Sequence, residues 1–179
     1  MKQFIIMTFI DKPSEQRISQ LHPKVRDEVR SIINHINNNL LTGKAKVRIA
    51  QGTRTWAEQT ELYNQGRTKP GKKVTNAKAG QSIHNYGLAV DIVLIVDNDG
   101  NGTYEIASWD TKKDFDLDKQ ADWMEVVAYF KSKGWSWGGD WRSFKDMPHF
   151  EKTFGKSLRD LQTLHTNKKW ITGTNFVQI

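Results

Sequence analysis

The segment from Ser82 to Asp91, SIHNYGLAVD, places a histidine and a carboxylate seven positions apart, at His84 and Asp91. It runs into Leu88–Val96, which is nearly all apolar and rich in β-branched residues, and this composition predicts a buried central strand. Asp91 is the lone charge in that strand, and a carboxylate there is costly unless it is paired or bound to a metal. Gly87 can supply the bend that returns the imidazole over the strand. We therefore expect the fold and the chemistry to centre on this segment.

A second fragment, DMPHFE, adds His149 and, three residues earlier, Asp146. Two histidines and one carboxylate, with a fourth position left to water, form the usual ligand set of a catalytic zinc ion. In a continuous strand Asp146 would face away from His149, so a role as base requires a turn at Met147 and Pro148. Taken singly, each histidine is better explained as a hydrogen-bonded residue near the surface. Together with Asp91, the histidines favour a metal site.

The composition bounds the class of protein. A chain of 179 residues, 37% hydrophobic and with seven tryptophans, is long enough for one domain with a substantial core and too short for two. The absence of cysteine excludes disulfides, thiolate metal sites and a cysteine nucleophile, so a metal must be held by histidine and carboxylate. The net charge of +7 suits a polyanionic partner, although a merely solubilising surface explains it equally well. We expect no nucleic-acid partner, because no recognition motif is visible.

The first ten residues, MKQFIIMTFI, are too short to span a membrane and lack a cleavage site of small residues. They do not read as a signal peptide and are predicted to form a strand or a packed arm. A protein made in the cytoplasm and acting outside it would then need another export route, which the sequence does not identify.

The predicted fold class is α+β, with a small, largely antiparallel sheet packed against a few helices. Thr55 and Glu58 match a capping box, and Arg54 before them lies at a strand-to-helix corner. His22 and His35 are read as capping or surface residues. In chain order, the predicted elements are a helix over 22–40, a strand over 45–50, a helix over 55–66, a basic loop over 68–80, the central strand, a turn and short strand within 97–110, a helix over 118–133 and a short helix over 157–165.

Two motifs together resemble a known family. The pattern S-x-H-x-x-G-x-A-x-D at Ser82–Asp91, followed by WGGDW and D-x-P-H-F-E within Trp137–Glu151, resembles the zinc peptidases of peptidoglycan. That family includes D-alanyl-D-alanine carboxypeptidases and L-alanyl-D-glutamate endopeptidases, and the sequence is most similar to the second, endolysin-like branch. Supporting segments lie at Leu21–Pro23 and Gly52–Arg67. The resemblance covers about 14–155 of a single domain over 1–179, leaving 156–179 as a C-terminal extension.

The resemblance implies a hedgehog/D-Ala-D-Ala peptidase-like fold with the zinc site on the sheet. It implies one Zn²⁺ per chain, held by His84, Asp91 and His149, with Asp146 as general base. Aspartate rather than glutamate at the base position is typical of the endopeptidase branch. Arg54 corresponds to an arginine that polarises the scissile carbonyl or binds a substrate carboxylate. The implied reaction is hydrolysis of the L-alanyl-D-glutamate bond of peptidoglycan stem peptides by a zinc-activated water, carried out by a monomer.

Five further residues are candidates for lining the substrate groove or supporting the site. Ser82 lacks an accompanying Ser-His-Asp pattern, so a hydrogen-bonding role fits it better than a nucleophilic one. Glu151 lies two residues after a proposed ligand and on the same strand face, where it can hold the imidazole. Ordinary packing explains all five equally well. The candidates are Ser82, Gln59, Trp137, Asp140 and Glu151.

A hexapeptide that begins at Asp97, DNDGNG, matches the first half of a calcium loop. The twelfth position of such a loop should be acidic but is Ser108, and Glu105 stands at the ninth. A simple turn is the better interpretation, and calcium at Asp97, Asp99 and Asn101 is a weaker hypothesis.

Two other functions remain open. A D-alanyl-D-alanine carboxypeptidase or dipeptidase would use the same ligands with a different groove. A catalytically silent wall-binding module would keep the fold alone, although the presence of both Asp146 and Arg54 argues against it. The sequence does not distinguish a phage lysis enzyme from a bacterial wall-remodelling enzyme.

Overall fold

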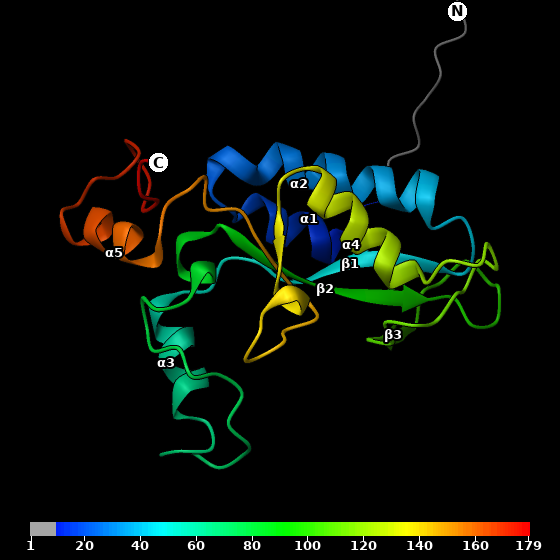
Figure 1. Cartoon of the computed structure of the whole chain (residues 1–179), viewed down its shortest axis with the longest axis horizontal. Coiled ribbons are helices and arrows are strands. Elements are labelled where there is room, and N and C mark those ends of the chain that lie inside the picture. The colour runs from blue at the N-terminus through cyan, green and yellow to red at the C-terminus, as the bar shows by residue number, and fades with distance from the viewer. Residues whose placement is uncertain (1–9) are drawn as a thin grey trace, which may run out of the picture.

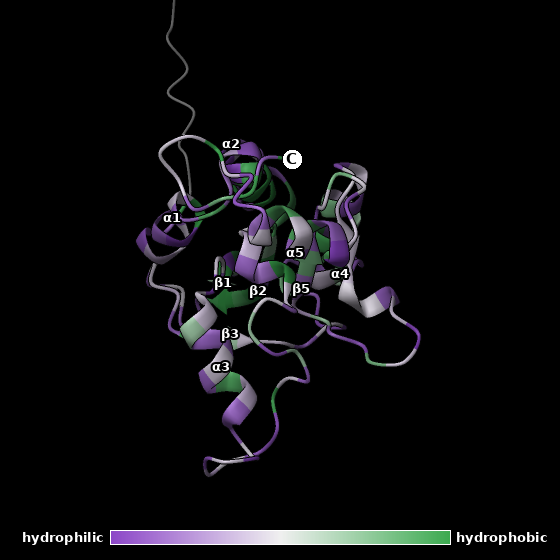
Figure 2. Ribbon diagram, turned by 90° about the vertical axis from the view of Figure 1, so that its left-hand side faces the viewer, coloured by the Kyte–Doolittle hydropathy of each residue, from purple (hydrophilic) through white to green (hydrophobic). Residues whose placement is uncertain are grey.

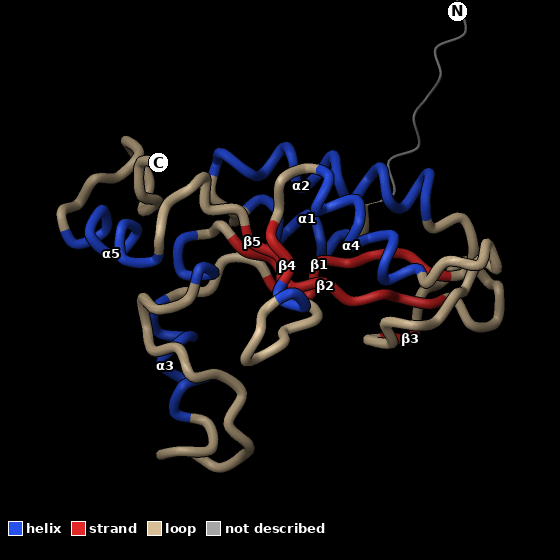
Figure 3. Tube along the Cα trace, in the orientation of Figure 1, coloured by secondary structure: helices blue, strands red, loops and turns tan. Residues whose placement is uncertain are grey.

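The computed structural model describes residues 10–179, and its centre is a five-stranded antiparallel sheet. The strands follow the order β1-β2-β5-β4, and β3 pairs with β2 (Figure 3). The long apolar segment forms the central strand, as predicted, and the α+β class is confirmed. The strands are β1 (Ala45–Gln51), β2 (Ala89–Val96), β3 (Ile106–Ser108), β4 (Ser136–Trp137) and β5 (His149–Glu151).

Three helices, α1, α2 and α4, lie over one face of the sheet (Figure 1). Figure 2 shows the hydrophobic segments gathered in the strands and on the inner sides of these helices, whereas α3 is mostly polar. A π-helical turn, Ile36–Leu40, continues α2, so the helix predicted over 22–40 is confirmed. The helices are α1 (Lys12–Ser19), α2 (Pro23–His35), α3 (Trp56–Asn64), α4 (Asp122–Ser132) and α5 (Leu158–Thr166).

The strand β2 separates the core from the site. Val90, Ile92 and Leu94 belong to the hydrophobic cluster beneath the helices. Side chains alternate between the two faces of a strand, so Asp91 faces the opposite side. Full burial of an aliphatic side chain contributes about 1.5–3 kcal/mol of stability. Turning the strand over would expose Val90, Ile92 and Leu94, so their burial fixes the face on which Asp91 lies.

The N-terminal part of the described chain contains a helix that the sequence analysis did not predict. Asp11 caps α1 by accepting a hydrogen bond from the Ser14 amide at 3.1 Å, and Pro13 lies in the first turn. The arm predicted over residues 1–10 falls almost entirely outside the described residues.

The helix predicted from Asp118 begins at Asp122 instead. Leu117 and Lys119 adopt positive φ angles of 64° and 78°, which a helix does not admit. The preceding aspartates form a loop, and the predicted boundary was wrong by four residues.

The C-terminal segment 156–179 packs against the rest of the molecule. Leu161 and Val177 are fully buried in the same hydrophobic cluster as the sheet and helices. His22, predicted to be a capping or surface residue, is the N-cap of α2 but is only 1% exposed, because its Nε2 bonds the carbonyl of Val177 at 2.9 Å. Among residues 10–179, no helix has the length and apolar character needed to cross a membrane.

Candidate metal centre and active-site cleft

A short 3₁₀ turn, Ile83–Tyr86, carries His84 to the edge of the sheet. The turn ends at Gly87, whose φ of +69° is left-handed, and a Cβ on it would lie 2.6 Å from the His22 amide nitrogen. The predicted pivot is therefore confirmed, and only glycine fits it.

Asp91 and His149 are direct neighbours on the antiparallel strands β2 and β5. Side chains of paired residues project from the same face of a sheet. Strand pairing alone thus brings together two groups that lie 58 residues apart in the chain.

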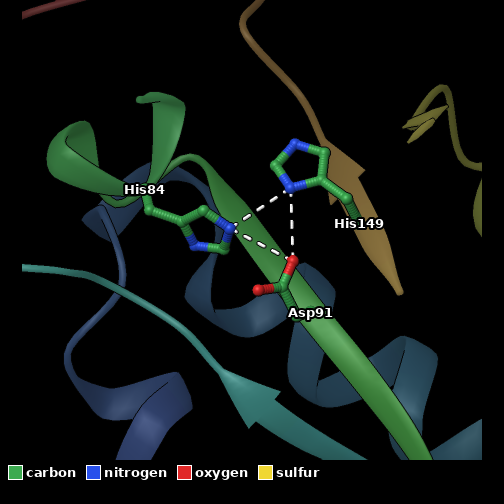
Figure 4. A group of neighbouring side chains, drawn as sticks. All are labelled: His84, Asp91 and His149. Atoms are coloured by element: carbon green, nitrogen blue, oxygen red, sulfur yellow. Dashed lines mark hydrogen bonds and ion pairs between the residues drawn. The ribbon is translucent and has the colours of Figure 1, made fainter. Parts of the chain in front are cut away.

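Three atoms converge on one point in front of the sheet (Figure 4). His84 Nε2 and His149 Nδ1 each lie 3.2 Å from Asp91 Oδ1, and the two nitrogens are 3.2 Å apart. Ligands at about 2.0–2.1 Å from a tetrahedral zinc ion are separated by roughly 3.3 Å. The triangle therefore has the size of one face of a zinc coordination sphere.

The outer nitrogens of both imidazoles have their own acceptors. His84 Nδ1 donates to the carbonyl oxygen of Gly52 at 2.8 Å, and His149 Nε2 donates to Glu151 Oε2 at 2.9 Å. Neutral rings in these tautomers turn lone pairs, not protons, towards Asp91. Three acceptor atoms facing one another require a cation, so the donor set fits a metal ion.

The electrostatics of the site favour positive charge. Burial alone would raise the pKa of Asp91, but the two imidazoles hold it well below its usual range. Burial alone would lower the pKa of His149, but hydrogen bonds to Asp91 and Glu151 outweigh it and raise the value to about 9. A second proton on the ring, at Nδ1, is therefore the alternative to a metal ion between His149 and Asp91. Both shifts indicate a pocket that stabilises a cation next to a permanently ionised Asp91.

Asp146 lies beside this triangle without belonging to it. The His149 amide donates to the carbonyl of Asp146 at 3.2 Å, so the chain makes the turn required at Met147 and Pro148. Gly138 allows the turn to approach, because a Cβ there would clash with the Asp146 carbonyl and lie 3.1 Å from the His149 Cβ. Burial, and then the charge of Asp91, raises the pKa of the Asp146 carboxyl group.

Arg54 brings a cation to the same cleft from the corner before α3. Its Nη2 lies 3.8 Å from Asp91 Oδ2, and its Nη1 donates to Gln59 Oε1 at 2.9 Å. Gln59 in turn donates to the carbonyl of Ala77 at 2.7 Å. Gln59 thus holds the guanidinium in place and does not itself line the cleft.

These groups lie in a cleft of about 630 Å³ that is lined by both polar and apolar side chains. Among the apolar lining residues, Leu62 and Val74 come from α3 and the loop after it, and Trp141 and Phe144 come from the segment between β4 and β5. Of these four residues, only Trp141, within the WGGDW motif, was a candidate from sequence. Apolar side chains that line a cleft cannot be told from core residues by sequence, because only the fold shows which of them are exposed in the cleft.

The other candidates differ in what they do. Ser82 and Glu151 line the cleft, as predicted. Trp137 is nearly buried and donates its indole N–H to the carbonyl of Met147 at 2.7 Å, which braces the turn before His149. Asp140 pairs with Lys131 of α4 at 2.7 Å and is not among the residues that line the cleft.

Comparison with known proteins agrees with this arrangement. A family model described as D-alanyl-D-alanine carboxypeptidase, of the M15 peptidases, matches residues 75–152. The chain is 43% identical over 133 residues to the peptidoglycan L-alanyl-D-glutamate endopeptidase CwlK of Bacillus subtilis, covering 74% of each chain. The crystal structure of the L-Ala D-Glu endopeptidase ChiX of Serratia marcescens matches with a TM-score of 0.50 and 22% identity, over 80% of this chain and 88% of that one.

The structural similarity to ChiX supports the fold. The sequence identity to CwlK, over about three quarters of each chain, is high enough to show that the two proteins are homologous. M15 peptidases are metal-dependent, in agreement with the triangle of His84, Asp91 and His149. The chain belongs to the M15 family of metallopeptidases.

Proposed function

We propose that this protein is a zinc-dependent endopeptidase that hydrolyses the L-alanyl-D-glutamate bond of peptidoglycan stem peptides. The observation that carries the proposal is the triangle of His84 Nε2, Asp91 Oδ1 and His149 Nδ1, with sides of 3.2 Å, at the floor of an open cleft. Two neutral imidazoles and one carboxylate leave a fourth coordination position free, as a hydrolytic centre requires.

When bound there, zinc would lower the pKa of a coordinated water to about 7 and polarise the scissile carbonyl. His84 and His149 would hold it through the nitrogens that face Asp91, while Gly52 and Glu151 fix the two rings.

Asp146 acts as the general base and then as the general acid. Its carboxylate lines the cleft next to the three converging groups, so it can accept the proton of the attacking water. The same carboxyl group then protonates the leaving amine. The turn through Met147 and Pro148 keeps this carboxylate in place beside His149.

Arg54 stabilises the negative charge that develops on the carbonyl oxygen. Its guanidinium lines the cleft and is fixed by Gln59, so little reorganisation is needed during the reaction. Burial lowers the pKa of Arg54, and the charge of Asp91 opposes that shift, so the side chain stays cationic.

The choice of scissile bond rests on kinship. CwlK and ChiX are both named as L-alanyl-D-glutamate endopeptidases. The base position also carries aspartate, the residue that the sequence analysis associated with that branch. The description of the matched family model keeps D-alanyl-D-alanine carboxypeptidase as the second candidate.

We also propose a single domain that acts on the cell wall as a monomer. Leu161 and Val177 of the C-terminal segment share one hydrophobic cluster with the sheet, which supports one folding unit. Every group assigned to the reaction comes from one chain, so no second copy is needed to complete the site.

Digestion of purified peptidoglycan, followed by mass spectrometry of the products, tests the function. New peptides that begin with D-glutamate or D-isoglutamine are expected, and a zinc chelator should abolish them. Release of terminal D-alanine would favour the carboxypeptidase. Cleavage that is insensitive to the chelator would contradict the zinc mechanism, and no cleavage by zinc-loaded protein would favour a silent module.

A further inference from the structure

Residues 114–125, DFDLDKQADWME, form a second acidic cluster, at the start of α4. Counted from Asp114, the acidic residues occupy positions 1, 3, 5, 9 and 12 of a twelve-residue segment. Those are side-chain ligand positions of an EF-hand calcium loop, which ends in a glutamate at position 12. The acidic residues are Asp114, Asp116, Asp118, Asp122 and Glu125.

The fold brings these carboxylates together in two overlapping groups. One carboxylate oxygen each from Asp114, Asp116 and Asp122 lie within 4.8 Å of one another. The same holds for Asp116, Asp118 and Glu125. Since Asp116 belongs to both groups, the two groups are direct neighbours.

Asp122 supplies an independent sign of a ligand. Its side chain is only 1% exposed, and its Oδ1 accepts the Phe115 amide at 2.8 Å. Its Oδ2 is buried and has no hydrogen-bond partner among the described residues, and the same is true of Glu125 Oε2. Buried carboxylate oxygens without partners are costly, and a cation is the partner that ionised carboxylates accept most readily.

The local charge balance agrees with cation binding. Lys46 is a cation close enough to influence Asp116 and Asp122, but its ammonium donates to the carbonyls of Asn37 and Leu41. Five carboxylates, with only Lys46 and the segment's own Lys119 to balance them, leave an excess of negative charge. A divalent cation coordinated by oxygen would reduce this repulsion.

One position departs from the usual pattern. Position 6 of the loop is normally glycine, because the chain turns sharply there. Lys119 occupies it and adopts the required left-handed conformation, with φ of 78°. The chain therefore makes the sharp turn of a calcium loop at position 6 although Lys119, not glycine, stands there.

We propose that residues 114–125 bind one calcium ion through these five carboxylates, with the backbone carbonyl of Gln120 at position 7. Asp116 Oδ2 also accepts hydrogen bonds from the amide and hydroxyl of Thr42, each at 3.1 Å, next to the start of β1. The ion would therefore tie the first turn of α4 to the end of the sheet remote from the catalytic cleft.

The loop that begins at Asp97 is the weaker calcium candidate. Oxygens of Asp97, Asp99 and Glu105 also lie within 4.8 Å. However, both oxygens of Asp97 accept backbone amides, from Gly100 and Gly102 among others.

Both oxygens of Asp114 accept backbone amides as well, so that feature does not separate the two loops. The difference lies in Asp122 Oδ2 and Glu125 Oε2, which are buried without partners, whereas no carboxylate oxygen of the loop at Asp97 is buried without one. The simple turn therefore explains the loop at Asp97.

Calcium titration of the zinc-loaded protein, after dialysis against calcium-free buffer, tests the proposal. Calorimetry should give one calcium per chain, and saturating calcium should raise the melting temperature by roughly 5–10 °C, with a much smaller effect of magnesium. Glu125→Gln, which is nearly isosteric and relieves repulsion, should weaken calcium binding at least 10-fold. Asp99→Asn in the other loop is the matched control and should bind as the wild type does.

Absence of calcium binding by the wild type would overturn the proposal. Undiminished binding by Glu125→Gln, or a loss of binding in Asp99→Asn, would overturn it as well. These readouts do not involve peptide hydrolysis, so the outcome is independent of the proposed peptidase activity.

Discussion

His84 and His149 approach each other through different ring nitrogens, Nε2 and Nδ1, at 3.2 Å across 65 residues of sequence. The opposite nitrogen of each ring is hydrogen-bonded, in His84 to the carbonyl of Gly52 and in His149 to the carboxylate of Glu151. These bonds determine which nitrogen of each ring is left to bind a metal. The metal centre therefore depends on two acceptors that would not touch the metal.

Glu151→Gln should weaken zinc binding about 10–100-fold, because a neutral amide holds the His149 ring less firmly than a carboxylate does. Competition with a chelating dye measures the affinity. Glu61→Gln is the matched control, since Glu61 is an exposed residue paired with Lys69. Equal zinc affinities for the two variants would contradict this role of Glu151.

Asp146→Asn should keep the zinc ion and lose about 10²–10⁴-fold in kcat, because the amide cannot accept the proton of water. Zinc content and hydrolysis of a stem peptide should be measured on the same preparation. Asp140→Asn provides the control, as Asp140 pairs with Lys131 outside the cleft and should leave kcat unchanged. A fully active Asp146→Asn enzyme would exclude Asp146 as the base.

Gly138→Ala should reduce kcat about 100-fold, because its Cβ would displace the turn that carries Asp146 and His149. Gly102→Ala is the control for a glycine substitution far from the site: its φ of +87° strains an alanine, but nothing lies within 4 Å of the Cβ, so stability should fall while kcat stays unchanged. Stem-peptide hydrolysis by the soluble, folded variants measures the effect. Wild-type kcat in Gly138→Ala would show that the close approach is not required.

His22 should make stability depend on pH. Its Nδ1 accepts the Lys24 amide and its Nε2 donates to the Val177 carbonyl, so the folded state needs a neutral ring. Burial, assisted by the charges of Lys24 and Arg26, lowers its pKa below 6.5. The contribution of His22 to the free energy of unfolding is therefore complete above pH 6.5, the pKa of a free histidine. It is lost as the pH falls through the lower pKa of the folded state.

Urea unfolding of the wild type and of His22→Gln at about pH 7.5 and about pH 5.5 measures this contribution. The wild type should lose more unfolding free energy between the two pH values than the variant does. Equal losses would mean that His22 does not titrate on unfolding.

Local signals predicted much of this structure. The apolar, β-branched segment predicted β2, and the Thr55–Glu58 capping box and Gly87 were identified from residue types alone. The groups that form the triangle were also found from sequence, because a lone carboxylate in an apolar strand needs a partner. The strand, the capping box and the glycine each depend on a few neighbouring residues, whereas the triangle required two separate motifs to be combined.

Non-local features could not be predicted. The order β1-β2-β5-β4 depends on pairing between β2 and a three-residue strand, and so short a strand has no distinctive pattern. The ion-pair partner of Asp140 is non-local as well, since only the fold shows that Lys131 lies beside it. The regular spacing of acidic residues from Asp114 to Glu125 is visible in the sequence. It was not predicted as a loop, because the helix was expected to begin at Asp118.

Anomalous diffraction at the zinc absorption edge, from crystals of the protein purified with zinc, tests the central claim most directly. The account predicts one strong peak at about 2.0–2.2 Å from His84 Nε2, Asp91 Oδ1 and His149 Nδ1. A zinc-loaded, active protein whose anomalous peak lies away from these three atoms would contradict it.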